Sequence, residues 1–176
     1  MKTAKYLIIL AVAVGVFASD AAAQKKKTPI RKTSTAAKPT TKPALTSDVI
    51  LAKNQVSNQL FNVNAFVDKL GPIAVGIESI DSEAKSKRVK KSVLDENETN
   101  KQKLVEAIRG LRAGLTDLET QFRTKPDLKK YLVNLQGITD LSARSEDSAL
   151  AGKFVASKDP LRTVAKKLGD TLAVMP

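Results

Sequence analysis

Apolar side chains recur every three or four residues through the middle of this 176-residue chain. The clearest run has spacings of 4, 3, 4, 3 and 4 and consists of Leu104, Ile108, Leu111, Leu115, Leu118 and Phe122. This alternation puts all six side chains on one stripe of an α-helix, the pattern of a helix packed lengthwise against others. A half-buried β-strand would instead alternate every second residue. The run therefore predicts a bundle of helices.

Similar stripes lie on both sides of this run, and turn-forming residues separate them. Gly71 followed by Pro72 is typical of a helix end and the first turn of the next helix. Thr99, with a glutamine three residues later, fits a capping box at a helix start, and Pro126 and Pro160 fit first helical turns. We expect helices near residues 47–70, 73–93, 99–123, 126–154 and 160–174.

Short connections between successive helices favour antiparallel neighbours. The predicted fold is all-α: an up-and-down helical bundle of four long helices plus a shorter C-terminal helix, spanning residues 44–176 and preceded by a disordered basic arm. Gly137 and Gly152 leave the continuity of the 126–154 helix open. Lys87 and Arg88 stand where the next apolar layer of the second helix belongs, so this end is expected to project beyond the core.

The first 23 residues have the three parts of a secretory signal peptide. Lys2 and Lys5 precede an apolar run from residue 6 to 18, and Ala21 and Ala23 are small residues suited to cleavage after Ala23. Cleavage after Ala18 and an uncleaved anchor are the alternatives. The run is shorter than the roughly 20 residues of a spanning helix. A secreted or periplasmic protein is predicted, and the absence of cysteine argues against a lipoprotein.

Residues 24–43 form a basic arm without acidic residues. Its cations are Lys25, Lys26, Lys27, Arg31, Lys32, Lys38 and Lys42. Three prolines and mutual charge repulsion favour an extended, disordered linker. Most of the chain's net charge of +12 lies here. Two interpretations stand: a handle for polyanions such as anionic lipid, envelope polymer or nucleic acid, or a hydrated spacer.

A second basic run lies near the expected end of the second helix. It consists of Lys85, Lys87, Arg88, Lys90 and Lys91. These residues are candidates for a second polyanion-binding patch acting with the arm. The competing explanation is local, because cations favour a helix C-terminus and can pair one turn away, as Lys85 could with Asp81.

Catalytic chemistry has few candidates in this sequence. The chain has neither histidine nor cysteine, which removes the commonest general base and the strongest thiol nucleophile. Glu146 and Asp147 fit a solvated helix surface. The spacing of Asp95 and Glu106 matches a calcium loop, but Asn100 replaces that loop's glycine, and two lysines add positive charge inside it. We predict no enzyme activity, catalytic residue, cofactor or metal site.

Two glycines interrupt the strong central helix, at Gly110 and Gly114. Gly114 lies beside the apolar stripe and could admit a neighbouring helix. Gly110 lies on the expected outer face, where it is either tolerated or marks a contact surface flanked by Arg109 and Arg112.

The function predicted from these features is a binding or structural role at the cell envelope or outside the cell, with the arm as an electrostatic tether. A nucleic-acid binder that uses the arm is one alternative. A membrane-active bundle is another, and it requires large apolar faces on the outside of the helices. The pattern specifies no oligomeric state.

Overall fold

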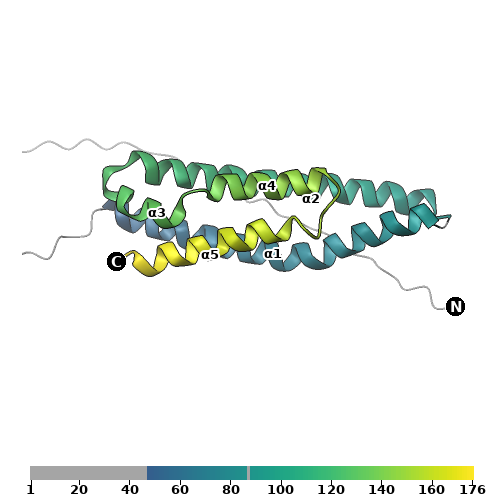
Figure 1. The fold of residues 1–176 in the computed structure, drawn as a ribbon, viewed down its shortest axis with the longest axis horizontal. Coiled ribbons are helices and arrows are strands. Elements are labelled where there is room, and N and C mark those ends of the chain that lie inside the picture. The colour runs from purple at the N-terminus through teal and green to yellow at the C-terminus, as the bar shows by residue number, and fades with distance from the viewer. Residues whose placement is uncertain (1–46, 87) are drawn as a thin grey trace, which may run out of the picture. The chain divides into compact units, whose positions relative to one another are not determined.

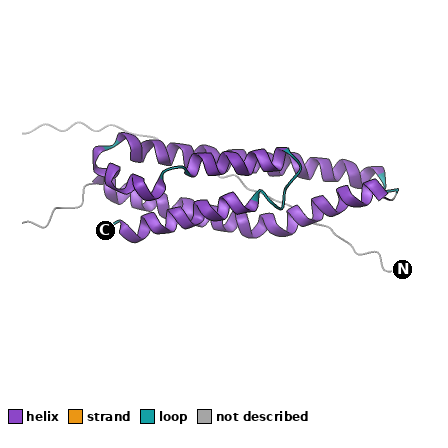
Figure 2. Ribbon diagram, viewed as in Figure 1, coloured by secondary structure: helices purple, strands orange, loops and turns teal. Residues whose placement is uncertain are grey.

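The computed structural model describes residues 47–86 and 88–176, and this part of the chain is an all-α bundle (Figures 1 and 2). The predicted fold class is confirmed. The signal peptide, the basic arm and Lys87 lie outside the described residues.

Four antiparallel helices build the bundle. Helix α1 (Ser47–Ser86) is followed by α2 (Lys91–Thr124), which runs back along it. A 3-10 helix η1 (Pro126–Tyr131) and the short α3 (Leu132–Leu135) reverse the chain. Helix α4 (Ile138–Leu150) then packs along α2, and α5 (Lys158–Val174) returns along α1 (Figure 1). The four helices that alternate in direction along the bundle are therefore α1, α2, α4 and α5.

The helix break expected at Gly71 and Pro72 is wrong, because α1 continues through both residues. Pro72 is exposed, whereas Leu70 and Ala74 are buried and continue the apolar stripe across it. A proline has no amide hydrogen, so the carbonyl of Asp68 loses its helical donor. Because Pro72 faces outward, water can replace that donor while packing holds the inner face together.

The start of the central helix also differs from the prediction. Helix α2 begins at Lys91, and Thr99 lies inside it, where the hydroxyl donates to the Asp95 carbonyl oxygen at 2.9 Å. Thr99 is therefore no helix cap. The whole segment from Asp95 to Glu106 is helical, so it forms no calcium loop.

The region expected as one helix over 126–154 is divided into three pieces. Gly137, with a φ of +88°, separates α3 from α4, and Gly152, with a φ of +74°, follows the end of α4. Side chains rarely adopt this left-handed backbone, and glycine adopts it readily. The two glycines thus allow the changes of backbone direction that bound α4 on both sides.

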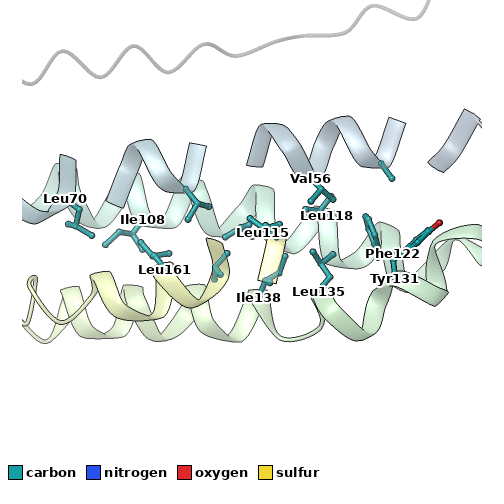
Figure 3. Packing of buried hydrophobic residues seen from close by; sticks show 14 of the residues in the cluster. Val56, Leu70, Ile108, Leu115, Leu118, Phe122, Tyr131, Leu135, Ile138 and Leu161 are labelled. Atoms are coloured by element: carbon teal, nitrogen blue, oxygen red, sulfur yellow. The ribbon is translucent and has the colours of Figure 1, made fainter. Parts of the chain in front are cut away.

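The core is aliphatic, as expected, with few aromatic side chains. Val56 and Leu70 of α1 meet Ile108, Leu115 and Leu118 of α2 and residues of the other helices in one continuous cluster (Figure 3). Leu111 is only half-buried. Gly114 leaves room for the side chain of Gln59 on α1, since a Cβ atom at Gly114 would lie 2.8 Å from Gln59 Nε2. Gly110 has no side-chain neighbour within 4 Å of such an atom.

The two long helices extend beyond the other two, as Figure 1 shows. The connection between α4 and α5 passes over Glu78, whose carboxylate accepts a hydrogen bond from the Val155 amide at 2.8 Å. Beyond this level, residues 79–86 and 88–97 form a two-helix projection, here named the hairpin tip. The predicted projection of the second basic region beyond the core is confirmed.

Candidate polyanion-binding site

The described members of the second basic run lie at the turn of the hairpin tip. Lys85 lies in the last turn of α1, Arg88 and Lys90 lie in the connection, and Lys91 begins α2. All four are exposed. Lys91 forms an ion pair with Asp95 one turn later, at 2.8 Å. Because both partners are largely solvated, this pair contributes little stability and leaves the lysine accessible.

The local ion pair expected between Asp81 and Lys85 is not formed. Asp81 instead accepts from Lys101 Nζ at 2.7 Å and from Asn97 Nδ2 at 2.9 Å, both on α2. Burial lowers the pKa of Lys101, but its hydrogen bond and attraction to Asp81 outweigh that effect and raise the pKa overall. Asp81 therefore links the two helices, and Lys85 stays free of this network.

Asn97 completes a polar layer where the four-helix core ends. Its side chain is buried, and its Nδ2 also approaches the Ile77 carbonyl oxygen at 3.4 Å. Its Oδ1 is buried without a hydrogen-bond partner among the described residues. A buried amide tolerates few alternative alignments, because a shifted register would leave more of its polar atoms unpaired. We therefore expect Asn97 to favour this register of the hairpin tip over shifted ones.

Arg109 and Arg112, on either side of Gly110, bind a carboxylate of α4. Arg109 Nε donates to Glu146 Oε1 at 2.9 Å and Arg112 Nη1 to Glu146 Oε2 at 3.0 Å, which ties α2 to α4. Glu146 is buried, so its expected place on a solvated surface is wrong. The hydrogen bonds from Arg112 and then Arg109 lower the pKa of Glu146 despite burial. These residues are structural partners.

Glu119 is a second buried carboxylate with a structural role. It accepts from the backbone amides of Gly137 and Thr139, each at 3.0 Å, and from Arg123 at 3.0 Å. Burial would raise the pKa of Glu119, but the two backbone hydrogen bonds lower it overall. The carboxylate supplies the hydrogen-bond acceptors that the first turn of α4 lacks within the helix, and its charge is favourable there.

Sequence patterns contained a signal for both carboxylates. Glu119 follows Leu115 by four residues and precedes Phe122 by three, so it lies at the edge of the apolar stripe. Glu146 has the same spacing from Ser142 and Ala149, which are buried small residues. A carboxylate at core spacing is expected to find partners when it is buried. The identity of those partners depends on how α4 lies on α2.

Of the two predicted basic regions, the described fold contains only the second. Ser47, the first described residue after the arm, and Lys85 lie at opposite ends of α1. A helix rises 1.5 Å per residue, so these ends are about 60 Å apart. The structure brings together Lys85, Arg88, Lys90 and Lys91. The arm cations from Lys25 to Lys42 lie outside the described residues.

Within the described residues, no group of three or more acidic side chains is arranged to hold a metal ion. Helix α1 is long and apolar enough to cross a membrane by length and composition, a test that core helices of soluble proteins also pass. No family model, curated protein or solved structure gives a significant match to this chain.

Proposed function

We propose that this chain is an exported, non-enzymatic helical-bundle protein that acts by binding or by structure at the cell envelope or outside the cell. In this proposal the basic arm tethers the bundle to a polyanion. One observation carries it: arginines of the bundle form ion pairs with its buried carboxylates, whereas the arm has seven cations and no acid.

The paired arginines of the bundle and the cations of the arm are expected to contribute differently to polyanion binding. The bundle's buried carboxylates engage Arg109, Arg112 and Arg123, which draws these guanidinium groups into helix contacts. The arm cations follow one another along a short stretch of sequence, so they match the closely spaced charges of a polyanion. The tip adds four exposed cations. We expect the arm to dominate affinity and the tip to add a smaller increment.

The test compares the chain from Gln24 to Pro176 with a form that begins at Ala44 and with a length-matched form whose seven arm cations are glutamine. Each is eluted from heparin, duplex DNA and anionic-vesicle supports with rising salt. On duplex DNA, the logarithm of affinity should fall linearly with the logarithm of salt concentration. If all seven arm cations contact phosphates, they contribute a slope of about −6, and fewer contacts give a shallower slope. The two arm variants should elute at much lower salt. Equal elution of all three would overturn the tether.

A matched tip variant separates the two regions. Lys85, Arg88, Lys90 and Lys91 are replaced together by glutamine, and the arm is kept. A modest shift to lower salt is expected. A shift larger than that of the arm variants would instead place the main binding site at the tip. The predicted export is tested separately, by finding Gln24 as the mature N-terminus of the natural product by mass spectrometry.

A further inference from the structure

The outer face of α1 exposes an unusual share of apolar surface. Among the described residues, nine large apolar side chains are exposed, and four of them belong to α1. These four are Phe61 at 73%, Val75 at 59%, Leu51 at 56% and Ile50 at 49%. In its most apolar 18-residue window, only 28% of residues are buried. Much of the apolar content of α1 therefore does not serve its own core.

A regular stripe runs along this outer face. Its members are spaced alternately three and four residues apart: Leu51, Asn54, Asn58, Phe61, Ala65, Asp68, Pro72, Val75 and Ser79. Ala65 is half-buried and the other eight are exposed. Five of the nine side chains are apolar and Asp68 is the single charged one, so the stripe is suited to packing against another helix along a straight seam. The inner stripe of α1 already packs on α2 and α5, so this second seam has no partner within the described bundle.

The chemistry of the stripe narrows what can cover it. A polyanion is unsuitable, because the stripe contains no cation and Asp68 is acidic. Lipid is unsuitable, because Asn54, Asn58 and Asp68 would be buried without hydrogen-bond partners. The chain's own arm is unsuitable, because it offers seven cations and a single large apolar residue, Ile30. A fitting partner presents apolar side chains and amides at the same spacing, and α1 of a second copy does so.

We propose that two copies of this chain dock antiparallel through the outer stripe of α1. In this register, facing positions sum to 126. Leu51 then faces Val75 of the second copy, and the large Phe61 faces the small Ala65. Asp68 faces Asn58, whose amide can donate to the carboxylate. Asn54 faces Pro72, near the Asp68 carbonyl oxygen that the proline leaves without a helical donor.

The opposite orientation is less favourable. In a parallel pair each residue of the seam faces its own copy. The two Asp68 carboxylates would then meet, the two Phe61 rings would compete for one space, and two prolines would face each other. Antiparallel docking pairs large with small and acceptor with donor. It also gives a closed two-fold dimer, in which the same patch serves both copies.

Self-docking is independent of the proposed tether, because the stripe contains no arm residue. The first test measures molecular mass by sedimentation over a range of concentrations, for the chain from Gln24 to Pro176. A concentration-dependent dimer is expected. Phe61→Glu should raise the dissociation constant by about tenfold or more, since a charge replaces an apolar anchor. Val133→Glu is the matched control, because Val133 is also 73% exposed but lies on α3.

Circular dichroism of each variant shows whether the fold is retained, and Leu51→Glu gives a second disruption of the same seam. A chain that stays monomeric at every soluble concentration would overturn the proposal. Equal weakening by Phe61→Glu and Val133→Glu would also overturn this interface. A monomer that binds neutral phosphatidylcholine vesicles through Phe61 would assign the face to lipid instead.

The second test determines the orientation, and the absence of native cysteine makes it clean. Leu51→Cys and Val75→Cys are prepared singly and oxidised alone or mixed. Antiparallel docking predicts a disulfide only in the mixture. Residue 51 of one copy lies about 36 Å from residue 51 of the other copy, which is far beyond the reach of a disulfide. Disulfides within each single variant, with no preference in the mixture, would contradict the antiparallel register.

Discussion

The two long helices lie side by side but present different surfaces to solvent. Helix α2 has charged residues at many exposed positions, including Glu96, Lys103, Glu106, Arg109, Asp117 and Arg123. Helix α1 has no charged residue from Asn54 to Val67. Its exposed positions there include amides, a serine and Phe61.

This contrast separates two uses of a helix surface. Charged side chains on α2 are well hydrated, and two of its arginines reach Glu146 on α4. The amide and apolar surface of α1 has a smaller free-energy cost of desolvation than the charged surface of α2. A helix with one buried stripe and a hydrated outer face needs no partner outside the bundle. A second seam on α1 is the basis for proposing a further contact.

Two phenylalanines give the largest expected contrast between the helices. Phe122 on α2 is fully buried, whereas Phe61 on α1 is 73% exposed. Phe122→Ala should lower the free energy of unfolding by about 3–5 kcal/mol through lost burial and a cavity. Phe61→Ala should change it by less than about 0.5 kcal/mol in the monomer. Urea unfolding of both variants at low protein concentration measures the difference, and similar losses would break the comparison.

Replacing Glu119 tests whether a buried carboxylate of α2 stabilises the fold. Glu119→Ala leaves the amides of Gly137 and Thr139 without their acceptor, so a loss of about 2–3 kcal/mol in unfolding free energy is expected. Glu106→Ala, at an exposed site of the same helix, is the control and should have little effect. Equal effects in urea unfolding would show that the carboxylate does not stabilise α4.

Replacing Pro72 tests how much stability α1 loses through the missing hydrogen bond on its exposed face. Pro72→Ala restores an amide donor for the Asp68 carbonyl in a continuous helix. The free energy of unfolding should rise by about 1–3 kcal/mol, since proline is unfavourable in a helix interior. Thermal unfolding of the dilute monomer measures this gain. A loss of stability would mean that the ring of Pro72 makes contacts that favour the fold.

Acid should weaken the α2 contacts selectively. The pKa values of Glu119 and Glu146 lie below their ordinary value of 4.5 in the folded protein. The folded state therefore binds fewer protons than the unfolded state, so their stabilisation is present above about pH 4.5 and is lost as pH falls through the lowered pKa values. Unfolding free energies from pH 7 to pH 3 should show this loss, with a shallower decline for Glu119→Gln. An unchanged decline would exclude Glu119 from the acid response.

The two α2 glycines should give the smallest effects. Gly110→Ala meets no side chain, so it should raise stability by about 0.5–1 kcal/mol through helix propensity. Gly114→Ala should gain less, because Gln59 must move away from the new methyl group. Thermal unfolding compares the two variants. A larger gain at Gly114 would show that the side chain of Gln59 moves aside at little cost.

Much of the fold followed from local patterns. The 3–4 spacing from Leu104 to Phe122 predicted a helix and most of its buried side. The errors came where packing overrides a local preference. Pro72 predicted a helix break, yet the buried side chains on its inner flank keep α1 continuous. Thr99 fitted a helix cap, yet α2 starts eight residues earlier.

The sequence by itself determined the helical class, the aliphatic core and the separation of a basic arm from a nearly balanced bundle, because periodicity and charge are properties of the chain. Tertiary structure decided which carboxylates are buried, which cations they bind and which face of α1 stays uncovered. The reason is physical: the partners of Glu119 and Glu146 lie 18 to 37 residues away, except Arg123, which is on the same helix. Only the packing of α4 on α2 brings those distant atoms together.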